Sequence, residues 1–443
     1  MMNTQTTPPS AKDGLSAWLH YMGSIHVSAI DMGLSRVSPV YGKLDLAAAA
    51  PYVFMVAGTN GKGSTTATIA QICQQAGYKT ALYQSPHLVS FNERVRIDGQ
   101  MVDDQTLIDA FVAVEMARQA CGLSLSFFEM TTLAALVVFK KANCDVWVLE
   151  VGLGGRLDVV NLVTPDVCVI TNVAIDHVDW LGDTREAIGG EKAGILRQNS
   201  TLIYGEHDMP ESVASAIQDK AVTAYQLGVD FSYHEGEGQW VYHTPSVSMN
   251  LPYPKLAVVN ASVAVSAVLA STLKIESAAI RAGLSSVQLA GRFDKRVLHG
   301  RHWLFDVAHN EAGVRFLLSQ FLPLWQAHQK QYPNARLHTV FSMLADKDSS
   351  AVLSILHQAD LPLAGWHIAT IDNPRAMQAD ALKEKLGVYW AKEMIFVHEN
   401  LSRAAFSVVT DSTEADLILV FGSFHTISET LTALGAYRDF KAV

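Results

Sequence analysis

The sequence predicts a two-domain α/β protein built on doubly wound, mostly parallel sheets. Short, continuous apolar runs alternate with segments of helical periodicity, which is the pattern of buried parallel strands joined by helices. At 443 residues the chain is longer than one hydrophobic core usually supports. We place the domain boundary at residue 294, which gives domains 1–294 and 295–443.

The first domain is expected to open with helices at 15–22 and 40–49, followed by a strand at 52–57 that Gly58 closes. Residues 201–253 lose helical periodicity and contain short alternating pieces, which predicts a small β-rich annex. The remaining strands expected in this domain are 79–83, 146–151 and 167–173, and the remaining helices are 65–76, 104–122, 129–141 and 261–273.

The second domain repeats the strand–helix alternation on a smaller scale, so a Rossmann-like α/β fold is expected there. Its predicted strands are 303–307, 337–341, 366–370, 394–397 and 417–421.

Composition excludes several classes of function. The net charge is −10, from 33 basic and 43 acidic side chains, and a surface of that sign repels nucleic acid. No apolar run is long enough to span a bilayer, and the polar start lacks a signal pattern, so a cytoplasmic location is expected. The four cysteines stand singly, which favours reduced thiols over a metal or redox site.

A glycine-rich loop between an apolar strand and a helix is the strongest local signal. Glycines let the backbone fold around phosphate oxygens, and the amides at the helix start point toward them. Lys62 can neutralise the β- and γ-phosphates, and Ser64 can bind Mg²⁺. This P-loop-type signal, although not a strict Walker A sequence, predicts nucleotide binding by Gly58, Thr59, Asn60, Gly61, Lys62, Gly63 and Ser64.

Polar residues also follow two later strands. Glu150 ends one apolar run, and Asp176, His177 and Asp179 follow another, so we expect them at one edge of the sheet. Lys192, expected at a helix start, would be repelled by nearby divalent ions unless it carries CO₂ as a carbamate, which is an anionic oxygen ligand. By spacing alone it is an ordinary surface lysine.

In the second domain, Asp306 and His309 follow an apolar strand, and Ser423 follows another. Arg292 lies in the expected linker, where a guanidinium could clamp phosphates across an interdomain cleft. Each of these signals is weak alone.

Together the motifs resemble the folylpolyglutamate synthase family, within the larger group that includes the Mur ligases, and particularly its bifunctional branch, which also uses dihydropteroate. The resemblance covers nearly the whole chain and keeps the family's motif order. The motifs are GTNGKGS (58–64), SPHLVSFNERVRI (85–97), LEVGLGGRLDVVN (149–161), DHVDWLG (176–182), EKAGI (191–195), AGRF (290–293), DVAHN (306–310) and GSFHTI (422–427). One departure is His425, where the family often has an aromatic residue.

The resemblance implies roles for individual positions. It implies Ser64, Ser85, Glu150, His177 and a carbamylated Lys192 as ligands of two Mg²⁺ sites. It implies Asn260, Arg292 and Asp306 as contacts of ATP. It implies Ala29, Ile30, Asp31, Ser126, Phe127, Phe128, Glu129, Leu157 and Asp158 as the pterin-binding shell, with His309 and Ser423 near the incoming glutamate.

The implied activity is an ATP-dependent ligase, acting as a monomer, that adds L-glutamate to dihydropteroate and to reduced folates through an acyl phosphate. Catalytic roles then fall to Lys62, Lys192 and His309. A monofunctional folylpolyglutamate synthase and a Mur-type amino-acid ligase remain alternatives. A P-loop kinase or GTPase would leave the second domain unexplained, and a non-catalytic nucleotide-binding module would bind ATP without turnover.

Overall fold

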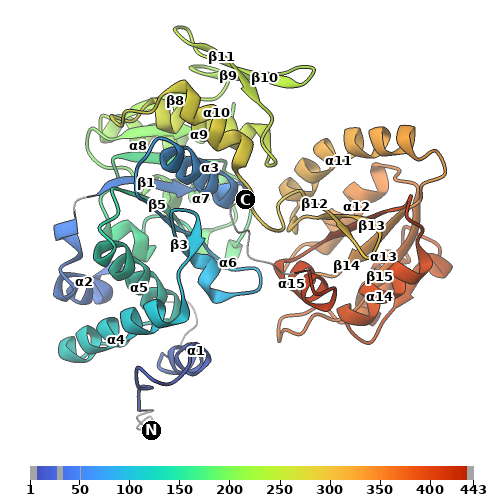
Figure 1. The fold of residues 1–443 in the computed structure, drawn as a ribbon, viewed down its shortest axis with the longest axis horizontal. Coiled ribbons are helices and arrows are strands. Elements are labelled where there is room, and N and C mark those ends of the chain that lie inside the picture. Colours follow the sequence, from blue (N-terminus) through green and yellow to red (C-terminus); the bar gives the residue numbers. More distant parts are fainter. Residues whose placement is uncertain (1–6, 27–32, 50, 437–443) are drawn as a thin grey trace. The chain divides into compact units, whose positions relative to one another are not determined.

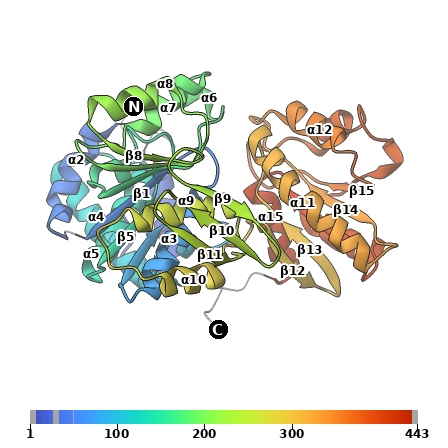
Figure 2. The same cartoon turned by 90° about the horizontal axis from the view of Figure 1, so that it is seen from above.

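The computed structural model describes residues 7–26, 33–49 and 51–436. The chain divides into two compact units, one up to Val287 and the other from Gln288 onward. Each unit is a sheet covered by helices on both faces (Figures 1 and 2), so the predicted fold class is confirmed. The functional boundary at residue 294 stays a prediction.

The first unit contains an eight-stranded sheet in the order β4-β3-β2-β5-β1-β6-β7-β8. The six strands from β2 to β8 in this order are parallel, whereas β3 and β4 are antiparallel additions at one edge. The strands are β1 (Tyr52–Ala57), β2 (Thr80–Tyr83), β3 (Val95–Ile97), β4 (Gln100–Met101), β5 (Val146–Glu150), β6 (Val167–Ile170), β7 (Thr201–Tyr204) and β8 (Thr223–Gln226).

Strand β1 shows why the sheet is covered on both faces. Val53 and Met55 belong to one hydrophobic core, whereas Phe54 and Val56 belong to a second core on the opposite face. The first face carries α1 (Leu15–Ser24), α2 (Leu34–Lys43), α4 (Asp104–Cys121), α5 (Phe127–Lys141), α7 (Arg185–Ala193) and α8 (Glu211–Asp219). The second face carries α3 (Lys62–Gln75), α9 (Val258–Leu269) and α10 (Ser277–Ser286).

The β-rich annex is smaller than predicted. Its three antiparallel strands are β9 (Ser232–Glu235), β10 (Gln239–His243) and β11 (Ser248–Pro252). The preceding residues, 201–226, instead extend the main sheet through β7 and β8 with α8 between them. The difference arises because β7 and β8 are short strands at one edge of the main sheet, and the alternating pieces that indicate an annex occur only after them, at 231–243.

The second unit has a six-stranded sheet in the order β12-β13-β17-β14-β15-β16, parallel except for β12. Its strands are β12 (Asp294–Leu298), β13 (Arg301–Phe305), β14 (Leu337–Phe341), β15 (Leu363–Ile368), β16 (Ile395–Val397) and β17 (Leu417–Phe421). Its helices are α11 (Glu311–Gln331), α12 (Ser349–Gln358), α13 (Ala379–Leu386), α14 (Leu401–Asp411) and α15 (Phe424–Ala433).

One predicted helix is wrong. The segment 40–49 was expected to be helical, but α2 spans Leu34–Lys43 and a separate 3-10 turn, η1, covers Leu46–Ala49. Pro39 lies inside α2, although a proline usually marks a helix boundary. Within the described part of the chain, no helix combines the length and the apolar character that crossing a membrane requires.

Candidate active site

The loop between β1 and α3 needs glycine at two positions. Gly58 has a φ of +148° and Gly61 a φ of +81°. A Cβ on Gly58 would lie 1.8 Å from Oγ1 of Thr171, and one on Gly61 would lie 2.4 Å from Oδ1 of Asn260. The loop therefore packs tightly against the end of β6 and against α9. This packing brings Asn260, a predicted nucleotide contact, to the loop.

Side chains after β6 hold this loop in shape. Oδ1 of Asn172 accepts hydrogen bonds from the amides of Thr59 at 3.1 Å and Asn60 at 2.8 Å. Oγ1 of Thr171 donates to the carbonyl of Asn60 at 2.6 Å. Because these bonds use side chains that the fold already positions, the loop backbone is fixed before any ligand binds.

The same loop has features that fit a phosphate. Gly61 caps α3 without a side-chain hydrogen bond, so no side chain covers the first amides of the helix. Nδ2 of Asn60 is buried and has no hydrogen-bond partner among the described residues. Nζ of Lys62 lies over the loop, donating to the carbonyls of Gly58 at 2.9 Å and Thr59 at 3.2 Å. These donors suit an anion.

Lys62, His177 and Lys192 line one small pocket of about 20 Å³. Lys192 is 2% exposed, and burial, together with the charge of Lys62, lowers its pKa to about 7, against an opposing effect of Asp176. Lys192 lies in the last turn of α7, not at a helix start as predicted. At this end of a helix the dipole stabilises a positive charge. The neutral form of Lys192 is therefore favoured by burial and by the charge of Lys62, against the effect of the dipole.

The predicted metal ligands come from three strand ends and two helices, α3 and α7. Glu150 is the buried last residue of β5, and its Oε2 accepts a hydrogen bond from the amide of Ser85 at 3.2 Å. Ser64 is buried in the first turn of α3. Among the described residues, no group of three or more His, Cys, Asp or Glu side chains could hold an ion. A metal here therefore needs hydroxyl or phosphate oxygens, or a modified lysine, as further ligands.

A larger pocket of about 240 Å³ adjoins the first, and His177 lines both. It gathers most of the residues predicted to bind the pterin. Ala29, Ile30 and Asp31 lie outside the described residues. The predicted pterin residues that line the pocket are Ser126, Phe128, Glu129, Leu157 and Asp158, and Phe127 is not among the lining residues. Ser85 and His177, predicted as metal ligands, also line it.

Asp158 organises the loop after β5. Its Oδ2 accepts hydrogen bonds from the amides of Gly152 at 2.9 Å and Leu153 at 3.0 Å, and its Oδ1 accepts from Val160 at 3.0 Å. Burial raises the pKa of Asp158 to about 6, although these three hydrogen bonds and Lys62 oppose the rise. Asp158 therefore shapes the pocket wall as well as facing the pocket.

Sequence reasoning gave no role to Arg94, which also lines this pocket. Arg94 is 9% exposed. Its guanidinium lies 5.9 Å from the ring centre of Phe127 and donates through Nε to Nδ1 of His87 at 2.8 Å. Both residues belong to the SPHLVSFNERVRI motif. The sequence feature that could have identified Arg94 and His87 is their place in this motif, which follows the end of a strand.

The second unit places its predicted residues near the ends of β13 and β17. The guanidinium of Arg292 lies 4.9 Å from the ring centre of Phe424. Asp306 accepts hydrogen bonds from the amides of Phe293 and Ala308, both at 2.9 Å, and burial raises its pKa against the opposing charge of Arg292.

His309 and Ser423 lie at the same strand ends. Nδ1 of His309 is 2.8 Å from the carbonyl of Val307, which can only accept, so Nδ1 carries a proton. Ser423 caps α15: its buried Oγ accepts from the amide of Thr426 at 3.0 Å. The structure thus gives Ser423 a capping role in addition to the predicted ligand role.

Comparison with protein families gives two matches that together span most of the chain. The model of the Mur ligase middle domain matches residues 56–262. The model of the Mur ligase glutamate ligase domain matches residues 291–424.

Individual relatives match over nearly their full length. A dihydrofolate synthase/folylpolyglutamate synthase of Escherichia coli (strain K12) is 39% identical over 432 residues, covering 97% of this chain and 98% of the relative. A solved structure of E. coli FolC in complex with DHPP and ADP has a TM-score of 0.89 at 39% identity, covering 97% and 99% of the two chains. A bifunctional folylpolyglutamate synthase/dihydrofolate synthase with Mn, AMPPNP and L-glutamate bound has a TM-score of 0.87 at 36% identity, covering 97% and 100%.

Proposed function

We propose, because the chain belongs to the dihydrofolate synthase/folylpolyglutamate synthase family, that it joins L-glutamate to dihydropteroate and to reduced folates at the expense of ATP. The observation that carries this proposal is the adjacency of two pockets in the first unit. The pocket of the phosphate-binding loop and the apolar pocket share Gly152, Leu153 and His177. A carboxylate on a flat, ring-bearing substrate in the second pocket can therefore approach a phosphate in the first.

The first step transfers a phosphoryl group. An oxygen of the substrate carboxylate attacks the γ-phosphorus of ATP, the bond to the β-phosphate oxygen breaks, and ADP leaves. Lys62 and the amides at the start of α3 stabilise the charge that develops on the phosphoryl oxygens. We assign further nucleotide contacts to Asn260, Arg292 and Asp306.

A divalent cation, when bound, supplies additional charge neutralisation for this transfer. The residues that would hold it are Ser64, Ser85, Glu150, His177 and a carbamylated Lys192, in two sites.

The second step forms the amide. The amino group of glutamate attacks the acyl carbon, phosphate leaves, and the nitrogen loses a proton. His309 is a suitable base because its Nδ1 is engaged by the carbonyl of Val307, so Nε2 can accept a proton. The glutamate-ligase role falls to residues 295–443 and the ATP and pterin roles to residues 1–294, apart from the nucleotide contact that we assign to Asp306. The monomeric state and the cytoplasmic location stay predictions from the sequence.

An assay of phosphate release tests the proposal against its alternatives. Release with dihydropteroate or tetrahydrofolate should require glutamate and should match amide formation. A muramoyl peptide should give no glutamate-dependent release. Lys62→Ala should lose ligation at saturating ATP while keeping its circular dichroism spectrum, because Nζ of Lys62 donates to the loop carbonyls of Gly58 and Thr59 and is not part of a hydrophobic core. Phosphate release that is independent of glutamate would contradict the ligase assignment.

A further inference from the structure

Arg94 brings a positive charge to the pocket of about 240 Å³ in the first unit. The two carboxylates that line the same pocket are engaged elsewhere. Glu129 accepts from Arg36, and Asp158 accepts from three backbone amides. Within the described ranges no carboxylate forms an ion pair with Arg94. The pocket therefore contains a cation whose charge the protein leaves without a paired anion.

The guanidinium of Arg94 is held in one orientation by neutral neighbours. Arg94 is the last residue of the 3-10 turn η2 (Phe91–Arg94). Its Nε donates to Nδ1 of His87 at 2.8 Å, so that ring is unprotonated at Nδ1 and neutral. The guanidinium lies 5.4 Å from the ring centre of Phe91 and 5.9 Å from that of Phe127. These groups orient the charge without neutralising it, and an anionic ligand would do so.

Arg94 lies at the end of the pocket that is nearest to the phosphate-binding helix. Its carbonyl accepts from the amide of Gln84 at 3.0 Å, and Nε2 of Gln84 donates to the carbonyl of Gly63 in the first turn of α3 at 2.8 Å. Ser85, a predicted metal ligand, follows Gln84 and lines the same pocket. Burial lowers the pKa of Arg94, and Glu150 is among the charges that oppose this shift. The charge thus lies on the side of the pocket where phosphoryl transfer is proposed.

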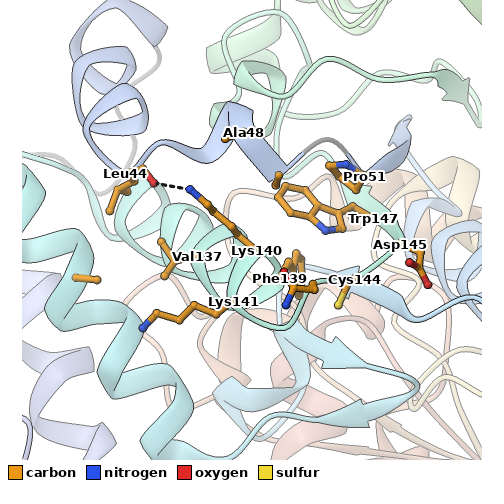
Figure 3. A pocket seen from close by; sticks show the side chains of 13 residues that line it. Leu44, Ala48, Pro51, Val137, Phe139, Lys140, Lys141, Cys144, Asp145 and Trp147 are labelled. Atoms are coloured by element: carbon orange, nitrogen blue, oxygen red, sulfur yellow. Dashed lines mark hydrogen bonds between the residues drawn. The ribbon is translucent and has the colours of Figure 1, made fainter.

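A larger hollow of the first unit lacks an enclosed charge of this kind among its described lining residues. It has a volume of about 730 Å³ and lies between η1, the C-terminal end of α5 and the start of β5 (Figure 3). Its apolar side chains Phe139 and Trp147 are 0% and 1% exposed, so a ligand could not reach them. Its lysines, Lys140 and Lys141, lie at the rim, where solvent reaches them. The smaller pocket is therefore the one that can enclose an anionic ligand.

We propose that Arg94 binds the reacting carboxylate of an aromatic acid substrate, which is dihydropteroate in the proposed function. This inference rests on that function and adds a substrate contact to it. One carboxylate oxygen accepts from the terminal N–H groups of the guanidinium, which leaves the other oxygen to attack the γ-phosphorus of ATP. An arginine suits this task because its planar donors match the geometry of a carboxylate and it stays charged when buried.

The same contact also serves the second step. The oxygen held by Arg94 becomes the carbonyl oxygen of the acyl phosphate. When the amine of glutamate attacks the acyl carbon, negative charge develops on this oxygen, and the guanidinium is in place to stabilise it. As phosphate leaves, the charge is withdrawn and the oxygen becomes that of the amide. Arg94 moves no proton in either step, because a guanidinium keeps its protons.

Two ligands that differ only in the carboxylate test this contact. They are dihydropteroate and 6-(anilinomethyl)dihydropterin, which carries hydrogen in place of the carboxylate. Calorimetry measures their binding to the full-length protein with Mg²⁺ and ADP present. The wild type should bind dihydropteroate about ten- to a hundredfold more tightly than the analogue, because the analogue cannot accept the charged hydrogen bond.

Variants of Arg94 should reduce this preference. Arg94→Gln should weaken dihydropteroate binding by about tenfold or more and leave binding of the analogue within about twofold. Arg94→Lys keeps the charge but not the planar donors, so it should retain part of the preference. Arg96→Gln, on β3 but outside the pocket, should change neither ligand. Circular dichroism shows whether each variant is folded, and Arg94→Lys carries the test if Arg94→Gln does not fold.

Equal weakening of both ligands by the Arg94 variants would overturn the inference, because Arg94 would then support the pocket or contact the ring system. That result would leave the ligase proposal standing, since the wild type would still bind and ligate dihydropteroate. A wild type that binds neither ligand, and releases no phosphate with dihydropteroate and glutamate, would overturn the proposed function and this inference with it.

Discussion

Arg36 donates to both carboxylate oxygens of Glu129, at 2.6 and 2.8 Å, and so joins α2 to the first turn of α5. The same guanidinium donates to the carbonyl of Ser124 at 2.6 Å. Glu129 in turn accepts from the amide of Ser126 at 2.7 Å, which completes a capping box. The family resemblance implies that Glu129 binds the pterin, and Glu129 lines the 240 Å³ pocket; these bonds show that it also positions the pocket wall.

The first prediction follows from this bidentate pair. Arg36→Ala should raise KM for dihydropteroate several-fold, because the pocket wall at 126–129 loses the ion pair that holds it in place. KM for ATP should stay unchanged, because the hydrogen bonds that hold the phosphate loop are not affected. The free energy of unfolding should fall by about 1–3 kcal/mol, since a buried carboxylate loses its partner. Steady-state kinetics and urea unfolding measure both effects. Arg315→Ala, which removes an exposed pair with Glu311, is the control that should change neither.

The second prediction concerns Asp158, whose two oxygens together accept three backbone hydrogen bonds. Asp158→Asn replaces one acceptor oxygen with an NH₂ group, which must face an amide donor. The loop after β5 should therefore lose order, and kcat/KM for dihydropteroate should fall at least tenfold. Amide hydrogen exchange of residues 152–160 should rise in the same variant. If kcat/KM falls while amide exchange stays as in the wild type, Asp158 contacts the substrate and does not act by shaping the loop.

Much of the fold was predictable because apolar runs mark buried parallel strands. The predicted strand 52–57 is β1 itself, and the runs at 337–341 and 417–421 are β14 and β17. The loop after β1 was also predictable, because its glycines, lysine and serine are contiguous in the sequence.

The features that could not be predicted from local sequence patterns depend on contacts between distant segments of the chain. The role of Asn260 beside the phosphate loop came only from the family resemblance, because Asn260 lies 199 positions after Gly61 and no local pattern links the two. Arg94 could not be assigned because its burial arises from packing with Phe91 and Phe127. The turn holding Lys192 was misplaced because 190–194 contains two glycines, which obscure where α7 ends.

A group of three histidines lies in the second unit, far along the chain from the candidate nucleotide loop. His338 is on β14, His367 on β15 and His398 just after β16, and Nδ1 of His367 is 3.2 Å from Nε2 of His398. Burial lowers the pKa of all three, that of His367 to about 3, with Asp416 opposing the shift at His338 and Asp411 that at His398.

The third prediction is a loss of stability in acid. Because the unfolded chain binds these protons near pH 6.5 and the folded chain does not, stability is fully present above pH 6.5 and falls as the pH drops toward 3. For His367, the full difference of one bound proton corresponds to a slope of about 1.4 kcal/mol per pH unit in that window, and His338 and His398 add to it in the same direction.

Hydrogen exchange measures this slope in the unit concerned. Peptides covering β14 and β15, compared at pH 7 and pH 5.5 after correction for intrinsic rates, should lose protection in the wild type. His367→Phe keeps a ring but cannot bind a proton, so its loss should be smaller. His243→Phe, at an exposed position on β10, is the control that should behave as the wild type. An equal loss of protection between pH 7 and pH 5.5 in all three proteins would show that these histidines do not cause the acid sensitivity.

The last prediction concerns Lys192, an amine that is 2% exposed and shares a small pocket with Lys62. An ammonium there repels both Lys62 and any divalent cation, whereas a carbamate supplies anionic oxygens of the kind that Mg²⁺ prefers. We therefore expect a carbamate signal from Lys192 in ¹³C NMR spectra of protein kept in ¹³C-bicarbonate, and no such signal in Lys192→Ala. That variant should lose ligation, and formate or acetate should partly restore it, because a small carboxylate can occupy the vacated space. Lys62→Ala is the matched control: its missing group is a cation, so carboxylates should not restore it. A fully active Lys192→Ala enzyme, or equal rescue of both variants, would show that Lys192 does not act through a carbamate.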